Sequence, residues 1–155
     1  MDSESVLLGM ALLCVCALPF AGMYYTNSKK QKAIFQEFLT DAQLSNADIS
    51  MHEIFNHFVL ALSQKSQFFY FFNTDLKHQK VQSVDLNGVK SVHMDKILNT
   101  QNKRIEKLNL VFVHRDTSQP PTIIELYNHE FTFQMSGELQ LAQRWVASLL
   151  PFTNN

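Results

Sequence analysis

The sequence predicts an α+β protein in which a transmembrane helix and an amphipathic helix precede a domain of short strands closed by a last helix. Three observations lead to this prediction. Residues 6–26 contain no charged side chain. Short apolar runs separated by turn residues fill the middle of the chain, as is typical of strands. Near the end, apolar residues recur at the three- and four-residue spacing of an amphipathic helix.

The uncharged run at residues 6–26 has the length of a membrane anchor. Its ~21 residues would extend roughly 30 Å as a helix, the thickness of the hydrocarbon core of a bilayer. Tyr24 and Tyr25 stand at its end, where aromatic rings favour the headgroup layer. A cleaved signal peptide is the alternative, because small residues lie near Gly22. Residues 1–5 carry acids and no Lys or Arg, whereas a signal peptide needs a positive start, so the sequence favours a retained anchor.

The charges beside the run predict its orientation. Lys29, Lys30 and Lys32 follow it, and no Lys or Arg precedes it. The positive-inside rule then places the C-terminal domain in the cytoplasm and residues 1–5 outside as a short tail. The chain is therefore expected to be a single-pass membrane protein. Both cysteines lie within the run, so the soluble part has no disulfide, thiol nucleophile or zinc knuckle.

An amphipathic helix is expected over residues 30–44, in a juxtamembrane segment of residues 27–48. Its apolar positions recur at helical spacing: Ile34, Phe35, Phe38, Leu39 and Ala42. We expect this stripe to pack on the domain that follows. A membrane-surface role for the lysine-rich start of the helix is the alternative.

Seven strands are expected in the soluble domain, residues 49–155. The Asn87-Gly88 pair predicts a two-residue hairpin between the fourth and fifth strands. The aromatic run 68–72 would direct rings to both faces of its strand, one face into the core and the other beneath the amphipathic helix. A ligand platform is the alternative for this run. The predicted strand ranges are 49–55, 58–63, 67–73, 80–86, 89–96, 105–115 and 122–128.

A last helix is expected to close the chain. Ser136 is its predicted N-cap, Glu138 would complement the helix dipole, and Pro151 would end it. One apolar face would include the only tryptophan of the chain: Leu139, Ala142, Trp145, Val146 and Leu149.

Seven strands followed by the helix SGELQLAQRWVASLL resemble the pleckstrin-homology-like fold. The resemblance implies a seven-stranded antiparallel barrel closed at one end by the C-terminal helix, with Trp145 in the plugging position. It does not imply a phosphoinositide site, because the turn Asn56-His57 lacks the Lys and Arg that such sites place there. The stretch from FFYFFN through ELYN to SGELQLAQRW is also similar to small bacterial membrane-anchored proteins, which bring no known activity with them.

Catalytic, cofactor and metal motifs are missing from the sequence. The segment HEIFNH places its histidines five apart, whereas a zincin helix needs four, so we expect no metal there. Glu125, Glu130 and Glu138 could supply carboxylates, but their spacing shows no pair. A net charge of −1 argues against nucleic-acid binding. We therefore expect no enzyme and no cofactor.

One modest basic patch remains as a candidate site. Lys96, Lys103, Arg104 and Lys107 flank one predicted hairpin and are candidate contacts with a membrane surface or a partner. The expected function is a membrane-tethered, non-enzymatic interaction module that contacts the bilayer through its anchor and an unknown protein through its domain. The alternative is an extracytoplasmic domain that binds a ligand or an envelope component.

Overall fold

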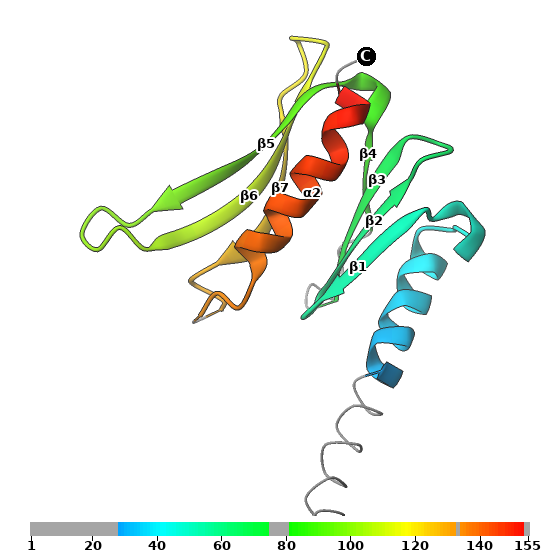
Figure 1. Ribbon diagram of the computed structural model, residues 1–155, viewed down its shortest axis with the longest axis horizontal. Helices are drawn as coiled ribbons and strands as arrows, with labels where there is room; N and C mark the ends of the chain where they lie inside the picture. The colour runs from blue at the N-terminus through cyan, green and yellow to red at the C-terminus, as the bar shows by residue number, and fades with distance from the viewer. Residues whose placement is uncertain (1–27, 75–80, 133, 154–155) are drawn as a thin grey trace, which may run out of the picture.

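The computed structural model describes residues 28–74, 81–132 and 134–153 of the chain (Figure 1). A helix over residues 28–41, here the N-terminal helix, is followed by the short 3-10 helix η1 (Asn46–Asp48). Seven strands come next, with a second 3-10 helix, η2 (Leu86–Gly88), before the fifth, and α2 (Glu138–Thr153) ends the fold. The strands are β1 (Met51–Phe55), β2 (Phe58–Ser63), β3 (Phe68–Asn73), β4 (Gln82–Asp85), β5 (Val89–Leu98), β6 (Ile105–His114) and β7 (Thr122–Asn128).

The strands form two antiparallel sheets. Sheet A has the order β1-β2-β3-β4 and sheet B the order β5-β6-β7. In the described residues no hydrogen-bonded ladder joins one sheet to the other, so the predicted closed barrel of seven strands is wrong. Helix α2 lies between the two sheets (Figure 1).

The corner between the sheets lies where a hairpin was predicted. Asn87 and Gly88 both belong to η2, and neither has the positive φ that a two-residue hairpin turn requires. The Asp85 carboxylate instead accepts the backbone N–H of Asn87 at 3.0 Å and caps η2. The chain therefore turns a corner from β4 into β5, and the two strands enter different sheets.

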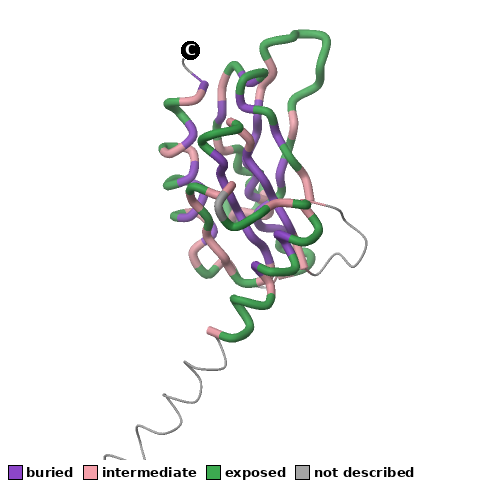
Figure 2. Tube along the Cα trace, turned by 90° about the vertical axis from the view of Figure 1, so that its right-hand side faces the viewer, coloured by how far each residue is buried: buried purple, intermediate pink, exposed green. Residues whose placement is uncertain are grey.

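One core fills the space between both sheets and α2. Phe69 of β3, Phe112 of β6 and Trp145 of α2 are fully buried there, and the indole meets the Phe69 ring edge-on at a centroid distance of 5.5 Å. Buried positions follow the strands and one side of α2 in Figure 2. The predicted burial of Trp145 is confirmed.

The outer face of sheet A is covered by the N-terminal helix. Phe38 is fully buried and lies 6.2 Å, between ring centroids, from both Tyr70 and Phe72 of β3. Phe69 and Phe71 of the same strand belong to the inner core. The aromatic run thus has both faces covered by packing, as predicted, and is no ligand platform.

Helix α2 differs from its prediction at both ends. It continues through Pro151 to Thr153. At the start, Ser136 is not the cap; the Glu138 carboxylate folds back and accepts the backbone N–H groups of Ser136 and Gly137 at 2.6 and 3.0 Å. A carboxylate at the positive end of a helix satisfies these donors directly.

The predicted transmembrane helix, residues 6–26, lies outside the described residues. No described helix is both long enough and apolar enough to cross a bilayer. The predicted fold, with its membrane-spanning helix and barrel, is therefore corrected to an α+β arrangement of two helices and two antiparallel sheets in the described part of the chain.

Candidate functional site

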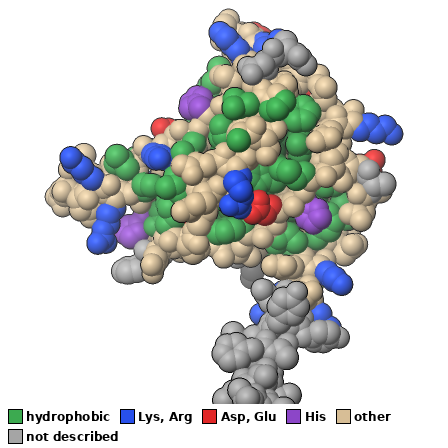
Figure 3. Space-filling view, viewed as in Figure 1, with side chains coloured by type: hydrophobic (Ala, Val, Ile, Leu, Met, Phe, Trp, Pro, Cys, Tyr) green, Lys and Arg blue, Asp and Glu red, His purple; other side chains and the backbone are tan. Residues whose placement is uncertain are grey.

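The hairpin of β5 and β6 extends beyond the core as an arm (Figure 1). Both strands are ten residues long, and burial ends toward the hairpin tip. Ile97 and Leu98, at the end of β5, are 44% and 49% exposed. Apolar and cationic side chains stand together along this arm on the face shown in Figure 3. The hairpin arm, residues 95–107, is therefore a projection with exposed apolar surface.

Side-chain amides hold the tip of the arm in one conformation. The side-chain oxygen Oδ1 of Asn99 accepts the backbone N–H groups of Gln101 and Asn102 at 2.8 and 3.3 Å. The Asn102 carbonyl oxygen accepts the backbone N–H of Arg104 at 3.0 Å. Lys103, between them, has a φ of 54°. The tip therefore fixes the backbone from which Lys103 and Arg104 project.

The four cations of the predicted basic patch do not share one face. Lys96 pairs with Leu108 across the strands, while Lys107 is the neighbour of Leu108 in β6, so the pleat directs Lys96 and Lys107 to opposite faces. Lys107 lies 3.9 Å from the Glu125 carboxylate. Only Lys103 and Arg104 lie together in the tip.

A hollow of about 520 Å³ lies beside the tip. Its walls come from the tip, the start of β6, the end of β7 and the segment before α2, parts that are far apart in sequence. The lining residues are mainly polar: Asn99, Asn102, Arg104, Ile105, Glu106, Tyr127, His129, Gln134 and Met135. Sequence reasoning singled out Arg104 from this group and missed the rest as a site, because only the β6–β7 register brings His129 to Glu106, through an N–H···O bond of 2.8 Å.

The hollow contains one cation and one anion with free hydrogen-bonding capacity. Within the described residues, the guanidinium of Arg104 has no hydrogen-bond or ion-pair partner. The Glu106 carboxylate accepts one hydrogen bond, from the Asn99 amide, through a single oxygen. The Tyr127 hydroxyl and His129 Nδ1 form a hydrogen bond of 3.3 Å. The hollow can therefore bind charged groups of both signs.

A second hollow, of about 300 Å³, has fewer polar groups available to a ligand. It lies between the β1–β2 turn, the end of β3 and β7, next to Phe131, which is 83% exposed. Its carboxylate, Glu125, is already engaged by the Asn128 amide at 3.1 Å and by Lys107. We therefore take the first hollow and the arm as the candidate site.

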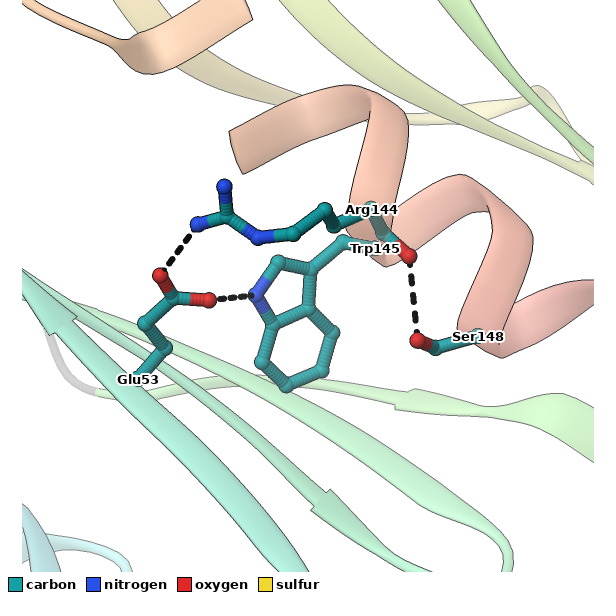
Figure 4. A network of polar contacts seen from close by, with 4 residues as sticks. All are labelled: Glu53, Arg144, Trp145 and Ser148. Atoms are coloured by element: carbon teal, nitrogen blue, oxygen red, sulfur yellow. Dashed lines mark hydrogen bonds and ion pairs between the residues drawn. The ribbon is translucent and has the colours of Figure 1, made fainter. Parts of the chain in front are cut away.

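The polar network in Figure 4 joins α2 to β1. The Glu53 carboxylate accepts the indole N–H of Trp145 at 3.2 Å with one oxygen and pairs with the Arg144 guanidinium through the other. Because both donors belong to α2, this carboxylate fixes the helix to the edge of sheet A. The network is structural, since it satisfies a buried indole.

The remaining candidate residues have packing roles. His52 stacks on Phe35 at a centroid distance of 4.0 Å, and His57 lies edge-on to Phe58. In the described ranges, no group of three or more His, Cys, Asp or Glu side chains could hold a metal ion. Glu138 is buried. Its carboxylate accepts the backbone N–H groups of Ser136 and Gly137 and an N–H of the Asn56 amide, the last at 3.3 Å.

Comparison of the chain with family models, with curated proteins and with solved structures found no match.

Proposed function

We propose that this protein is a non-enzymatic interaction module that acts at a membrane and docks a protein partner through its hairpin arm. The observation that carries the proposal is the exposure of two large aliphatic side chains, Ile97 and Leu98, on an arm whose tip carries the cations Lys103 and Arg104. The two aliphatic residues are consecutive in β5, so the pleat directs them to opposite faces of the arm. Exposed apolar surface rimmed by polar groups is typical of a docking site.

The chemistry of the arm defines the kind of partner. Because Ile97 and Leu98 lie on opposite faces, they favour an apolar cleft on the partner that contacts both faces of the arm, and the two tip cations favour acidic groups around it. The hydrogen-bonded tip lowers the entropy that binding would cost, because the backbone is already ordered. A partner with an apolar cleft and an acidic rim fits this arm.

Membrane localisation is part of the same proposal. It is supported by the uncharged residues 6–26 and by the lysines that follow them, which also favour a cytoplasmic domain. A relation to pleckstrin-homology-like domains is proposed as well. Its support is the order of seven strands before a C-terminal helix and the burial of Trp145 between the sheets.

Site-specific photocrosslinking in cells tests the arm. A photoreactive amino acid is placed at Leu98 of the full chain. The matched control places it at the exposed Asn87 in η2, at the other end of β5. The proposal expects a discrete protein adduct from position 98 and none from position 87, and Leu98→Ser should weaken capture of the identified partner. Adducts only to lipid, or equal adducts from both positions, would contradict a protein-docking arm.

Ligand binding is the second candidate function, and the polar hollow beside the tip is the observation that favours it. It does not require the arm to dock a protein.

A further inference from the structure

We propose that the hollow beside the hairpin tip binds a small zwitterion of the amino-acid or dipeptide class. Arg104 receives the carboxylate of this ligand and Glu106 its ammonium group. The inference rests on the hollow alone and is independent of the docking role of Ile97 and Leu98.

Arg104 is suited to a carboxylate. A guanidinium presents N–H donors in a planar fork that matches both oxygens of a carboxylate. In the described residues this fork has no partner, and the backbone N–H of Arg104 is fixed by the Asn102 side chain at 3.0 Å. Arg104 therefore lines the hollow from an ordered backbone, and its side-chain donors are unused in the described residues.

Glu106 is suited to an ammonium group. It is only partly exposed, and the Asn99 amide engages Oε1, which leaves Oε2 with no partner in the described residues. The backbone carbonyl of Glu106 accepts the N–H of His129, so the residue is held by both side chain and backbone. A fixed carboxylate with an open oxygen accepts an N⁺–H donor well.

The two groups line one hollow but form no ion pair with each other. A ligand that carries both charges can bridge them, whereas a simple anion or cation satisfies only one. This arrangement selects a zwitterion over a singly charged ligand, because a ligand with one charge leaves either Arg104 or Glu106 without a partner.

The remaining walls suit a short peptide. Ile105, Tyr127 and Met135 supply apolar surface for a side chain, and Asn102 and Gln134 supply amides for a peptide group. A volume of about 520 Å³ lies within the usual range for small-ligand sites.

Binding of alanyl-alanine to the full chain in detergent micelles tests the inference by isothermal titration calorimetry. N-acetyl-alanyl-alanine lacks the ammonium group, and alanyl-alanine amide lacks the carboxylate. We expect each blocked dipeptide to bind at least about tenfold more weakly than the zwitterion, because one charge-assisted contact is lost in each.

Variants then test which protein residue binds the carboxylate end of the dipeptide and which binds the ammonium end. Arg104→Gln should remove most affinity for alanyl-alanine and abolish the difference between it and the amide. Glu106→Gln should abolish the difference between it and the acetylated dipeptide, while its side chain keeps a carbonyl oxygen for Asn99. Lys90→Gln and Glu37→Gln remove the same charges at exposed positions outside the hollow and the arm and should leave affinity within about twofold.

Three outcomes would overturn the inference: no heat of binding at millimolar dipeptide, equal affinity for all three dipeptides, or the same loss from Lys90→Gln as from Arg104→Gln. Circular dichroism melting curves confirm that each variant is folded. Failure of this test leaves the crosslinking result at Leu98 unchanged, so the two proposals fail separately.

Discussion

Replacing Trp145 with alanine should remove a large share of the stability of the domain. The indole is fully buried between the two sheets, in edge-on contact with Phe69 at 5.5 Å, and its N–H donates to Glu53 at 3.2 Å. Both sheets and α2 share the core to which it belongs. The substitution therefore leaves a cavity in the core that all three elements share.

The size of the effect follows from these contacts. Truncating a buried Trp to Ala costs about 3–5 kcal/mol, which includes the residual cavity. Loss of the indole N–H adds little, because the Glu53 side chain is 35% exposed and can turn to water. A domain of this size has roughly 5–15 kcal/mol of stability in total. Trp145→Ala should thus remove a large share of it.

Trp145→Phe provides the matched comparison, because it keeps an aromatic ring and loses the hydrogen bond. We expect it to cost roughly 1–2 kcal/mol, mainly because the phenyl ring leaves part of the volume of the indole unfilled. Urea unfolding of the full chain in detergent, followed by far-ultraviolet circular dichroism, measures both variants. Trp145 is the only tryptophan, so its emission should be blue-shifted in the native protein and move to the red on unfolding. A Trp145→Ala variant within 1 kcal/mol of the parent would refute the packing argument.

Three further predictions concern other contacts. Arg144→Ala should cost less than ~1 kcal/mol in urea unfolding, because its side chain is 58% exposed and surface ion pairs contribute little; a cost above 2 kcal/mol would contradict this. Phe38→Ala should cost about 3–5 kcal/mol and increase binding of an apolar dye, since it uncovers sheet A; unchanged stability would count against the packing. The Ser118 hydroxyl, and then its backbone N–H, donate to Asp116 and lower the pKa of that carboxyl. Stability from this contact is therefore present above the ordinary pKa and lost as pH falls through the lowered one, and Ser118→Ala should raise the Asp116 pKa in an NMR titration.

Strands were predictable here because each is a short apolar run between strong turn residues. The strands β2 and β7 have the predicted bounds, and the others differ by one to two residues at one end or, for β4, at both ends. Side-chain alternation also predicted that the aromatic run directs rings to both faces of its strand, and Phe69 and Tyr70 lie on opposite faces of sheet A. These features depend on local pattern, which the sequence contains directly.

Closure of the sheet was not predictable from local pattern. It depends on whether backbone groups at distant edges align, and nothing in β1 or β7 alone specifies this. The Asn87-Gly88 pair was misleading because the Asp85 side chain stabilises a different turn at the same residues. The polar hollow was missed for a related reason: Arg104, Glu106 and His129 have no shared spacing and meet only through strand register.

The packing of the N-terminal helix on sheet A has a mechanical consequence. Phe35, Phe38 and Leu39 attach the second half of the helix to the sheet, and the carboxylate of Asp41, its last residue, accepts the backbone N–H of Val81 at 3.3 Å. A helix held at several points cannot swivel as a tether would. A pull or a rotation applied at residue 28 should therefore be transmitted to the strands as strain on the whole domain. The helix behaves as a rigid connection and not as a flexible linker.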